Sequence, residues 1–493
     1  MAPPNPSQGQ YVGPFGAGPA ANNNNNAWGI ANNPSGSKAA GQLSTIYAPN
    51  TNAVPTPGTV VIRLNGRLEV DLSAAFTNAD SSVSSSGAFG GYKVNPLGIA
   101  SNVRLYPGFD GVSSNGLRYG ASVEIRENFG AADRTFAVSG VTVTPGAASS
   151  PSSNSSTQTL YVRRAFTYIA SDQAGLLRLG QTDGVLDLFD PCIFTSQCWD
   201  GGEGGLQGSS GFPTVAPASV PITWVWINQA GAEYTNNKIV YLSPQFYGFD
   251  AGVQYAPNMG NSYQMVGLGV GCNQAGPTCI ATTSGNDTTR WYNQVGVGLR
   301  YQQTYGAVDV KAYGFYETAG KETLTTGAYI TPAASRIGGS AQTLQYDNLN
   351  FYKFGAAVTA LNFTLAADYI GGAVNGQLAM RPTGGAPMSA VVTGLTYANG
   401  PWTAGVQVGV ANSQGAAQLT GMTQRHEFGL ATGGSYRVAP GLRLVAEYQY
   451  DYRHQGGFNF ASNGLGAGTT ATAAGLTRDA RGQGIVFSTI LTW

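Results

Sequence analysis

The sequence predicts an all-β protein, a 16-stranded antiparallel transmembrane β-barrel, on the basis of three observations. The first is composition, since charged residues make up only 10% of the 493 residues while glycine numbers 70 and tyrosine 26. The second is a period of two in hydropathy, which recurs over segments of about ten residues. The third is that the links between these segments tend to alternate between short and long.

The composition also restricts the class of function. Soluble domains carry about 25% charged residues, well above the fraction found here. Lysine plus arginine equals aspartate plus glutamate at 25 each, so net charge gives no argument for a nucleic-acid partner. No run approaches about 18 consecutive apolar residues, which excludes a transmembrane helix. The first four residues lack the basic and apolar regions of an export signal, so we interpret the chain as mature or recombinant, with that signal removed.

The first 57 residues differ from the rest of the chain. They are rich in proline, asparagine, glycine and alanine, include a run of asparagine over 22–26, and show neither strand nor helix periodicity. We therefore predict that residues 1–57 form an arm, periplasmic or flexible, and that residues 58–493 form the barrel.

Alternation is clearest over residues 62–72, where every second residue is apolar except Gly66. Residues 442–452 repeat the pattern with Val445 as the exception, and residues 294–302 follow it too. Such segments face lipid on one side and water on the other. Because an unpaired backbone amide in hydrocarbon costs several kcal/mol, a spanning sheet has no free edge, so we expect the last strand to pair with the first.

This pattern predicts sixteen strands, near 59–72, 98–106, 117–127, 159–170, 175–182, 238–245, 249–257, 292–302, 307–317, 349–359, 363–370, 389–397, 402–411, 426–436, 442–453 and 484–493. Short links such as 303–306 and 398–401 lie between long segments such as 128–158, 183–237 and 454–483. Tight turns at one rim and long loops at the other are typical of outer-membrane barrels. A soluble β-sandwich also alternates in hydropathy, but it gives no such regular alternation of link lengths.

The four cysteines form two close pairs in the sequence, Cys192 with Cys198 and Cys272 with Cys279. Neither spacing is CxxC and the chain has only two histidines, which argues against a zinc site. We interpret these cysteines as two small-loop disulfides formed in an oxidising compartment. Four cysteines allow three connectivities, and local pairing is our hypothesis.

Several motifs resemble those of the Gram-negative general porin family. They are Arg163-Arg164-Ala165-Phe166 followed by Leu177-Arg178-Leu179-Gly180-Gln181, then Asn236-Asn237-Lys238-Ile239-Val240-Tyr241-Leu242-Ser243-Pro244, Leu395-Thr396-Tyr397-Ala398-Asn399-Gly400-Pro401-Trp402 and the terminal Trp493. Their order and spacing extend the resemblance over about residues 58–493. It implies a sixteen-stranded barrel among the lipid and lipopolysaccharide of the bacterial outer membrane, usually a homotrimer. It also implies that the third long loop, 183–237, folds into a water-filled pore through which small hydrophilic solutes and ions diffuse passively.

A channel of this kind works as a sieve combined with an electric field. Sixteen strands enclose a lumen too wide for side chains to fill, so a loop must narrow it. The predicted pore constriction consists of Arg63, Arg67, Arg104, Arg118, Arg126, Arg163 and Arg178 on the first five strands and Asp187, Asp190, Asp200 and Glu203 on the loop. Guanidinium groups keep their charge and would set a transverse field against these acids. The alternative is that the arginines merely solvate the lumen wall. Strict alternation places Arg163 inward and Arg164 outward.

Later strands add further inward positions, namely Arg300, Lys311, Lys353 and Arg443 against Asp309, Asp368, Glu427, Glu447 and Asp451. With Glu69, Asp71, Glu124 and the loop acids, basic and acidic groups are nearly balanced, which predicts weak ion selectivity of unassigned sign. Outward aromatic residues predict girdles at the membrane interfaces, namely Tyr397, Trp402, Tyr448, Tyr450, Tyr452 and Trp493.

Two other functions stay open at this stage. One is a substrate-specific channel for a sugar or an anion, in which lumen aromatics or a ladder of arginines bind the solute. The other is a secreted soluble β-sandwich array or adhesin. An enzyme is not expected, because no Gly-x-Ser-x-Gly elbow is present and His426 and His454 lack helical partner spacing. We expect no catalytic residue, no metal and no cofactor.

Overall fold

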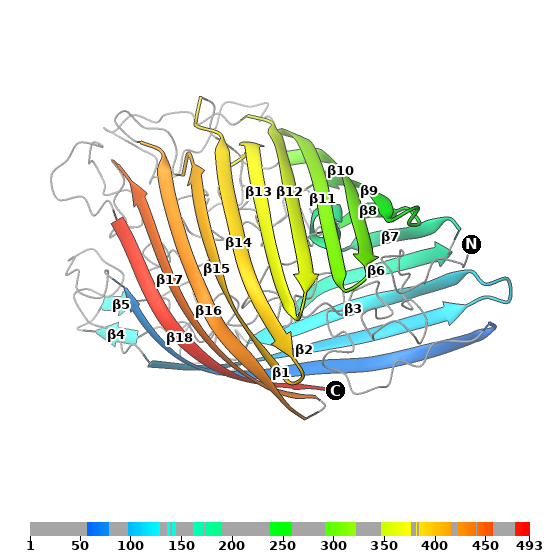
Figure 1. Cartoon of the computed structure of the whole chain (residues 1–493), viewed down its shortest axis with the longest axis horizontal. Coiled ribbons are helices and arrows are strands. Elements are labelled where there is room, and N and C mark those ends of the chain that lie inside the picture. The colour runs from blue at the N-terminus through cyan, green and yellow to red at the C-terminus, as the bar shows by residue number, and fades with distance from the viewer. Residues whose placement is uncertain are drawn as a thin grey trace.

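The computed structural model describes residues 57–77, 97–128, 136–138, 141–143, 161–171, 173–182, 184–189, 237–258, 291–321, 347–375, 381, 384–415, 423–439, 441–456 and 479–493. Sixteen strands form a closed barrel in which each is hydrogen-bonded to its neighbours along the chain and the last pairs with the first (Figure 1). The prediction of a 16-stranded antiparallel β-barrel is confirmed. In the described part of the chain, no helix has the length and hydropathy to cross a membrane.

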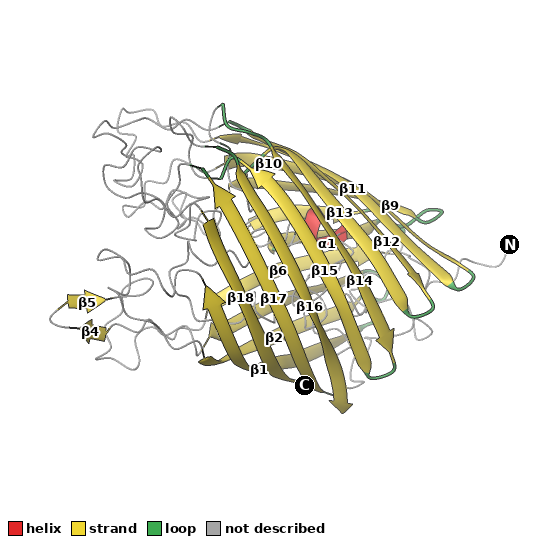
Figure 2. Cartoon of the chain, turned by 60° about the vertical axis from the view of Figure 1, so that its left-hand side comes forward, coloured by secondary structure: helices red, strands yellow, loops and turns green. Residues whose placement is uncertain are grey.

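The barrel strands are β1 (Thr59–Thr77), β2 (Leu97–Val112), β3 (Arg118–Asn128), β6 (Tyr161–Ser171), β7 (Gly175–Gln181), β8 (Asn237–Leu242), β9 (Phe249–Asn258), β10 (Trp291–Tyr305), β11 (Val308–Lys321), β12 (Leu349–Ala360), β13 (Phe363–Ala373), β14 (Met388–Asn399), β15 (Trp402–Ser413), β16 (Arg425–Ala439), β17 (Leu442–Gln455) and β18 (Asp479–Thr492). Each overlaps one of the sixteen predicted ranges. Two short strands, β4 (Phe136–Val138) and β5 (Val141–Val143), pair with each other and lie apart from the barrel wall (Figure 2). One short helix, α1 (Val185–Phe189), follows β7.

Barrel closure depends on the pairing of β1 with β18, which runs from Arg67↔Thr492 to Thr77↔Gly482. The backbone of Trp493 extends it through two hydrogen bonds with Gly66, at 3.1 and 3.2 Å. A Cβ atom added at Gly66 would come within 2.0 Å of Cζ2 of the Trp493 indole. Glycine therefore interrupts the apolar alternation of β1 at the position where the terminal indole covers the strand.

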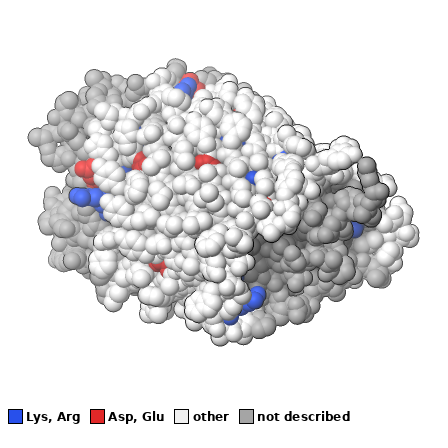
Figure 3. All heavy atoms as spheres, viewed as in Figure 1, with Lys and Arg blue, Asp and Glu red and all other residues white. Residues whose placement is uncertain are grey.

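The two faces of the wall differ as the alternation predicts. On β1, Ile62 and Leu72 are exposed on the outer face, whereas Arg67, Glu69 and Asp71 are buried on the inner face. On the face of the molecule in view in Figure 3, the described part of the outer surface accordingly shows few charged atoms. Lipid tails can solvate such a surface without leaving a charge unpaired.

Outward aromatic residues gather toward both ends of the strands. At the short-turn end, ring pairs have centroid distances of 4.7 Å for Phe249–Tyr301, 4.7 Å for Phe363–Tyr397 and 4.3 Å for Trp402–Tyr436. At the long-loop end, the pairs are Tyr352–Phe354 at 5.6 Å, Tyr352–Tyr369 at 6.1 Å and Phe428–Tyr450 at 6.3 Å. Tyrosine and tryptophan favour the interface between lipid and water, so these belts mark the edges of the apolar band.

Substitution of Gly66 tests the packing at the closure. Gly66→Ala should destabilise the folded barrel by about 1–3 kcal/mol, because the new methyl group occupies the space of the Trp493 indole. The loss should appear as a lower temperature for conversion of the compact band to the unfolded band on a semi-native gel. In a Trp493→Ala background the same glycine substitution should cost little, and an equal cost in both backgrounds would contradict this account.

Candidate functional site: the inner wall of the barrel

Charged side chains of both signs occupy the inner positions of the barrel strands. Those that the structure describes are Arg67, Arg104, Arg118, Arg178, Lys238, Arg300, Lys311, Lys353, Arg425, Arg437, Arg443 and Arg453 with Glu69, Asp71, Asp110, Glu124, Asp250, Asp309, Glu317, Asp368, Glu427, Glu447 and Asp451. The two signs are nearly equal in number. The wall is therefore strongly polar yet close to neutral.

Three of the predicted constriction arginines are aligned by strand register. Arg67 of β1 is opposite Arg104 of β2, and Arg104 is opposite Arg126 of β3. The side chains of Arg67 and Arg104 are buried on the inner face. Arg67 donates a hydrogen bond of 2.8 Å from Nη2 to Oε2 of Glu69, so an acid of its own strand partly balances its charge.

Two further predicted arginines lie at inner positions of β7 and β3, the strands on either side of β6. Arg178 on β7 is buried, with its guanidinium carbon 5.1 Å from the centroid of the Phe166 ring. Arg118 begins β3 at the short-turn end and is half-buried. For Arg63 and Arg126 the structure describes the backbone position alone, opposite Gly108 and Arg104 respectively.

A β-bulge changes the assignment of faces at positions 163 and 164. In the pairing of β3 with β6, Glu124 is opposite Arg164 and Ile125 is opposite Val162, so Arg163 has no partner across this ladder. Val162 is exposed, whereas Phe166 and Tyr168 are buried on the inner face. Position 164 therefore falls on the inner side of the ladder, opposite the buried Glu124, which differs from the strict alternation expected from the sequence. An extra residue of this kind reverses the alternation beyond it.

The predicted loop residues are described only in part. Asp187 lies in α1, where the backbone alone is described. Asp190, Asp200, Glu203 and all four cysteines, Cys192, Cys198, Cys272 and Cys279, lie outside the described residues, as do residues 1–56 of the predicted arm.

Helix α1 lies against the inner wall of the barrel (Figure 2). The strands that flank its loop are the shortest in the barrel, 7 residues for β7 and 6 for β8. Gly252 and Gly298 take inner positions on β9 and β10, and a Cβ at either would approach Val185 within 2.8 Å. The glycines thus leave room for an apolar helical turn to pack directly on the sheet.

Polar contacts hold both ends of α1. At its start, the backbone N–H of Val185 donates to Oε1 of Gln254 at 2.5 Å, and Gln254 donates to Glu317 at 3.2 Å. At its end, Arg300 donates to the carbonyl oxygen of Leu188 at 3.3 Å and lies 4.7 Å from the Phe189 ring centroid.

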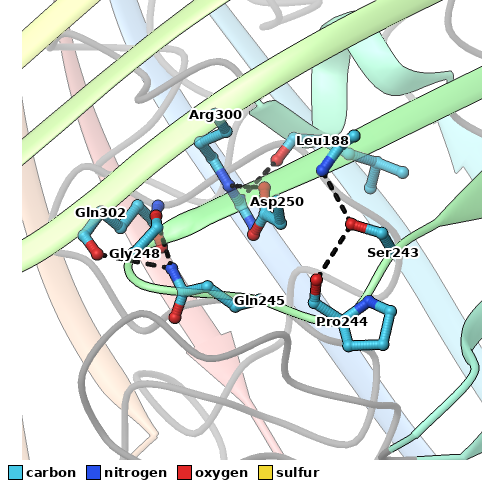
Figure 4. A network of polar contacts seen from close by, with 9 residues as sticks. Leu188, Ser243, Pro244, Gln245, Gly248, Asp250, Arg300 and Gln302 are labelled. Atoms are coloured by element: carbon cyan, nitrogen blue, oxygen red, sulfur yellow. Dashed lines mark hydrogen bonds and ion pairs between the residues drawn. The ribbon is translucent and has the colours of Figure 1, made fainter.

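Arg300 is itself fixed by a two-pronged ion pair. Its Nε and Nη2 atoms donate to the two carboxylate oxygens of Asp250 at 3.0 and 2.7 Å. Figure 4 shows this pair beside the Leu188 carbonyl and close to the short turn between β8 and β9. Because paired guanidinium bonds fix orientation, the wall presents one defined anchor to α1.

On the opposite part of the wall, β16 and β17 carry a column of polar residues along the barrel axis. Arg453 pairs with Glu427 at 2.6 Å, and Gln449 donates to Asp451 at 2.7 Å. At the long-loop end, Arg425 donates to Gln455 at 2.7 Å. One ion pair and two hydrogen bonds from or to neutral glutamines thus join the polar side chains of this part of the wall.

The inner wall is not polar throughout, which the sequence analysis did not anticipate. Phe315, Phe351 and Ile370 are buried on inner positions of β11, β12 and β13. Among them, Lys353 lies 5.6 Å from the Tyr313 ring centroid and pairs with Asp368 at 3.5 Å. The lumen therefore contains an aromatic region with one embedded ion pair.

The inner positions expected on later strands are correct for Arg300, Lys311, Lys353, Arg443, Asp309, Asp368, Glu427, Glu447 and Asp451. Seven charged inner residues were missed, namely Asp110, Lys238, Asp250, Glu317, Arg425, Arg437 and Arg453. Lys238, Asp250, Glu317 and Arg453 belong to predicted strands, so the same alternation would have found them. Asp110, Arg425 and Arg437 lie beyond the predicted strand ends.

The sequence profile described as Gram-negative porin matches residues 62–456 of this chain. A comparison with curated proteins finds no match.

Solved structures of porins resemble the chain at low identity. An anion-selective porin from Comamonas acidovorans is 13% identical with a TM-score of 0.47, over 88% of this chain and 100% of that one. OmpF of Salmonella typhi, in complex with daunomycin, is 11% identical with a TM-score of 0.47, over 88% and 97%. A triple mutant of Rhodopseudomonas blastica porin is 14% identical with a TM-score of 0.43, over 88% and 100%.

Removal of the Arg300 anchor should loosen α1. Arg300→Ala should raise the hydrogen–deuterium exchange rate of residues 185–189 by about tenfold, because hydrogen bonds to charged groups contribute about 1.5–3 kcal/mol. Arg300→Lys, which keeps the charge without the planar fork, should give an intermediate rate. Arg437→Ala, an exposed residue at the short-turn end, serves as the control. Exchange in Arg300→Ala at the wild-type rate would show that packing alone holds the helix.

Proposed function

The chain belongs to the Gram-negative porin family and is a channel of the bacterial outer membrane for passive diffusion of small solutes, and we propose that they pass along the charged inner wall described above. The observation that supports this path is the closed barrel with a polar inner face and an apolar outer face. The experiment is conductance in planar bilayers, where the purified chain should form ion-conducting pores.

We further propose that the constriction is formed by the predicted arginines and by the loop 183–237. Support comes from the register row of Arg67, Arg104 and Arg126 and from α1, which places the start of this loop on the inner wall. Asp187, Asp190, Asp200 and Glu203 remain the proposed acids of the loop. A disulfide between Cys192 and Cys198 would restrict its conformations.

The proposal excludes catalysis. Porins are channels, and cross-strand ion pairs join several of the charged groups of the described wall, as in Arg453–Glu427 and Arg300–Asp250. No cofactor is required for diffusion through an aqueous pore.

We propose that the chain assembles as a homotrimer through the outer face of β18, β1 and β2. That face carries exposed apolar residues, namely Ile62, Leu64, Leu72, Leu97, Ile99, Phe487 and Leu491. Tyrosine and tryptophan are absent from the outward positions of β1 and β2 that the structure describes, whereas both belts run along β9 to β17. Trp493, which continues β18 and covers Gly66, is the one tyrosine or tryptophan at the described outward positions of this face, and a face with so few interfacial aromatics fits contact with another subunit better than contact with lipid headgroups.

The second candidate function is a channel that binds a particular solute. The aromatic region around Tyr313, Phe315 and Phe351, beside the Lys353–Asp368 pair, favours it, because aromatic side chains with a few polar groups suit a sugar-like solute. Block of single-channel current by one such solute, in a concentration-dependent manner, would support binding over general diffusion.

Ion selectivity tests the role of the arginine row. The wild-type cation-to-anion permeability ratio should lie within about tenfold of unity, because wall charges of both signs are nearly balanced. Arg67→Gln combined with Arg104→Gln should shift the reversal potential toward cation selectivity. Arg481→Gln, which removes an exposed outward arginine on β18, is the matched control and should leave it unchanged. A double variant with wild-type selectivity would place the constriction elsewhere.

A pair of leucines tests the proposed subunit interface. Leu72 on β1 and Leu365 on β13 are both outward, with 52% and 59% of their surface exposed. Leu72→Trp should weaken the heat-sensitive oligomer on semi-native gels, because the larger side chain does not fit a packed interface. Leu365→Trp should be neutral, since lipid accommodates it. Equal behaviour of the two variants would exclude β1 from the interface.

A further inference from the structure

The only two histidines of the chain are direct cross-strand neighbours. His426 of β16 is opposite His454 of β17, next to the ends of these strands where the long loops begin. The adjacent Glu427 and Arg453 are buried on the inner face, so the two imidazoles project from the outer face. No short sequence spacing joins them, because 27 residues of strand and turn lie between them along the chain.

Each imidazole contacts a hydrogen-bond acceptor on the strand that flanks the β16–β17 pair, β15 for His426 and β18 for His454. Nδ1 of His426 lies 2.5 Å from Oδ1 of Asn412 on β15, and Nδ1 of His454 lies 2.7 Å from Oδ1 of Asp479 on β18. Strand register places these residues in one row, Asn412–His426–His454–Asp479. The two oxygens only accept hydrogen bonds, so in the neutral form of each imidazole Nδ1 carries the proton and Nε2 carries a lone pair.

This orientation brings the two lone pairs toward a common point. In imidazole, Nε2 is bonded to Cδ2, on the side of the ring opposite to Nδ1. Since each Nδ1 points away from the other histidine, each Nε2 leans toward the space between the rings. Side chains of directly opposed residues start about 4.5–5.5 Å apart at Cβ, a span that one ion with metal–nitrogen bonds of about 2.0–2.1 Å can bridge.

We propose that His426 and His454 bind one divalent transition-metal ion at the outer rim of the barrel through their Nε2 atoms. Asn412 and Asp479 position the rings, as carboxylate and carbonyl acceptors do for metal-bound histidines in general. The described residues contain no group of three or more His, Cys, Asp and Glu arranged for a metal. The site therefore supplies two protein ligands and leaves the other coordination positions to water.

The chemistry of the site selects the ion. Imidazole nitrogen suits copper, zinc and nickel, and affinity rises toward Cu²⁺ in the series of divalent ions. The negative charge of Asp479 favours the binding of a cation. The positive charge of the exposed Arg481, which pairs with Tyr452 in the register, disfavours it. A bound ion would join β16 to β17 at the rim from which the link to β18 departs, and this inference does not depend on the pore.

Electron paramagnetic resonance of bound Cu²⁺ tests the site directly. Untagged protein in detergent should bind one equivalent with hyperfine coupling to two imidazole nitrogens. His426→Gln and His454→Gln should each leave coupling to one nitrogen and weaken binding by about tenfold or more, and the double variant should lose the signal. Asn412→Ala should keep both nitrogens while lowering affinity about 10- to 100-fold, as expected of a positioning residue.

The control is Gln424→Ala, an exposed position two residues before His426, which should bind like the wild type. A compact band on semi-native gels shows that each variant is folded. The proposal is overturned if the folded double variant binds Cu²⁺ with wild-type affinity, or if the wild-type spectrum lacks coupling to a pair of imidazole nitrogens.

Discussion

The pairing of backbone hydrogen bonds in a medium without water governs the rest of this structure. Every strand that crosses hydrocarbon must find partners on both sides, so sixteen strands close on themselves and β1 pairs with β18. Closure assigns one face of every strand to lipid and the other to the lumen, which produces the hydropathy period of two. Trp493 also contributes to closure, because its backbone continues the β18 ladder onto Gly66 of β1 and its indole covers that glycine.

Strand number and order could be predicted because the period of two repeats in every spanning segment. Strand ends could not, since local residue types compete there with the ladder. Strand β2 continues through Pro107 and Gly108 to Val112, beyond the predicted strand near 98–106. Pro107 pairs with Leu64 on the β1 side, while the β2–β3 ladder is interrupted between Leu105 and Gly108. A strand can therefore tolerate proline where one neighbour supplies the pairing.

The hydropathy period of two also predicted which charged residues face the lumen. It could not predict which of these residues contact one another. Arg300 and Asp250 are 50 residues apart, and register alone brings them together. The bulge at Arg163 moves position 164 to the inner side of the ladder, and no neighbouring glycine or proline indicates a bulge there. Helix α1 has five residues, too few to show a helical period, so it was not predicted. The contact between His426 and His454 could not be predicted either, because strand register alone brings these distant residues together.

The aromatic part of the inner wall continues the apolar surface on which α1 packs. A loop surrounded by water would have only polar contacts to hold it, and such contacts exchange readily with solvent. Here Val185 and Phe189 pack on Gly298 while Phe315 and Phe351 extend the apolar surface beside them. Burial of apolar area stabilises the helical turn, and the Arg300–Asp250 pair fixes its position along the wall. Apolar packing thus stabilises α1 on the inner wall, while ion pairs such as Arg300–Asp250 keep the same wall polar.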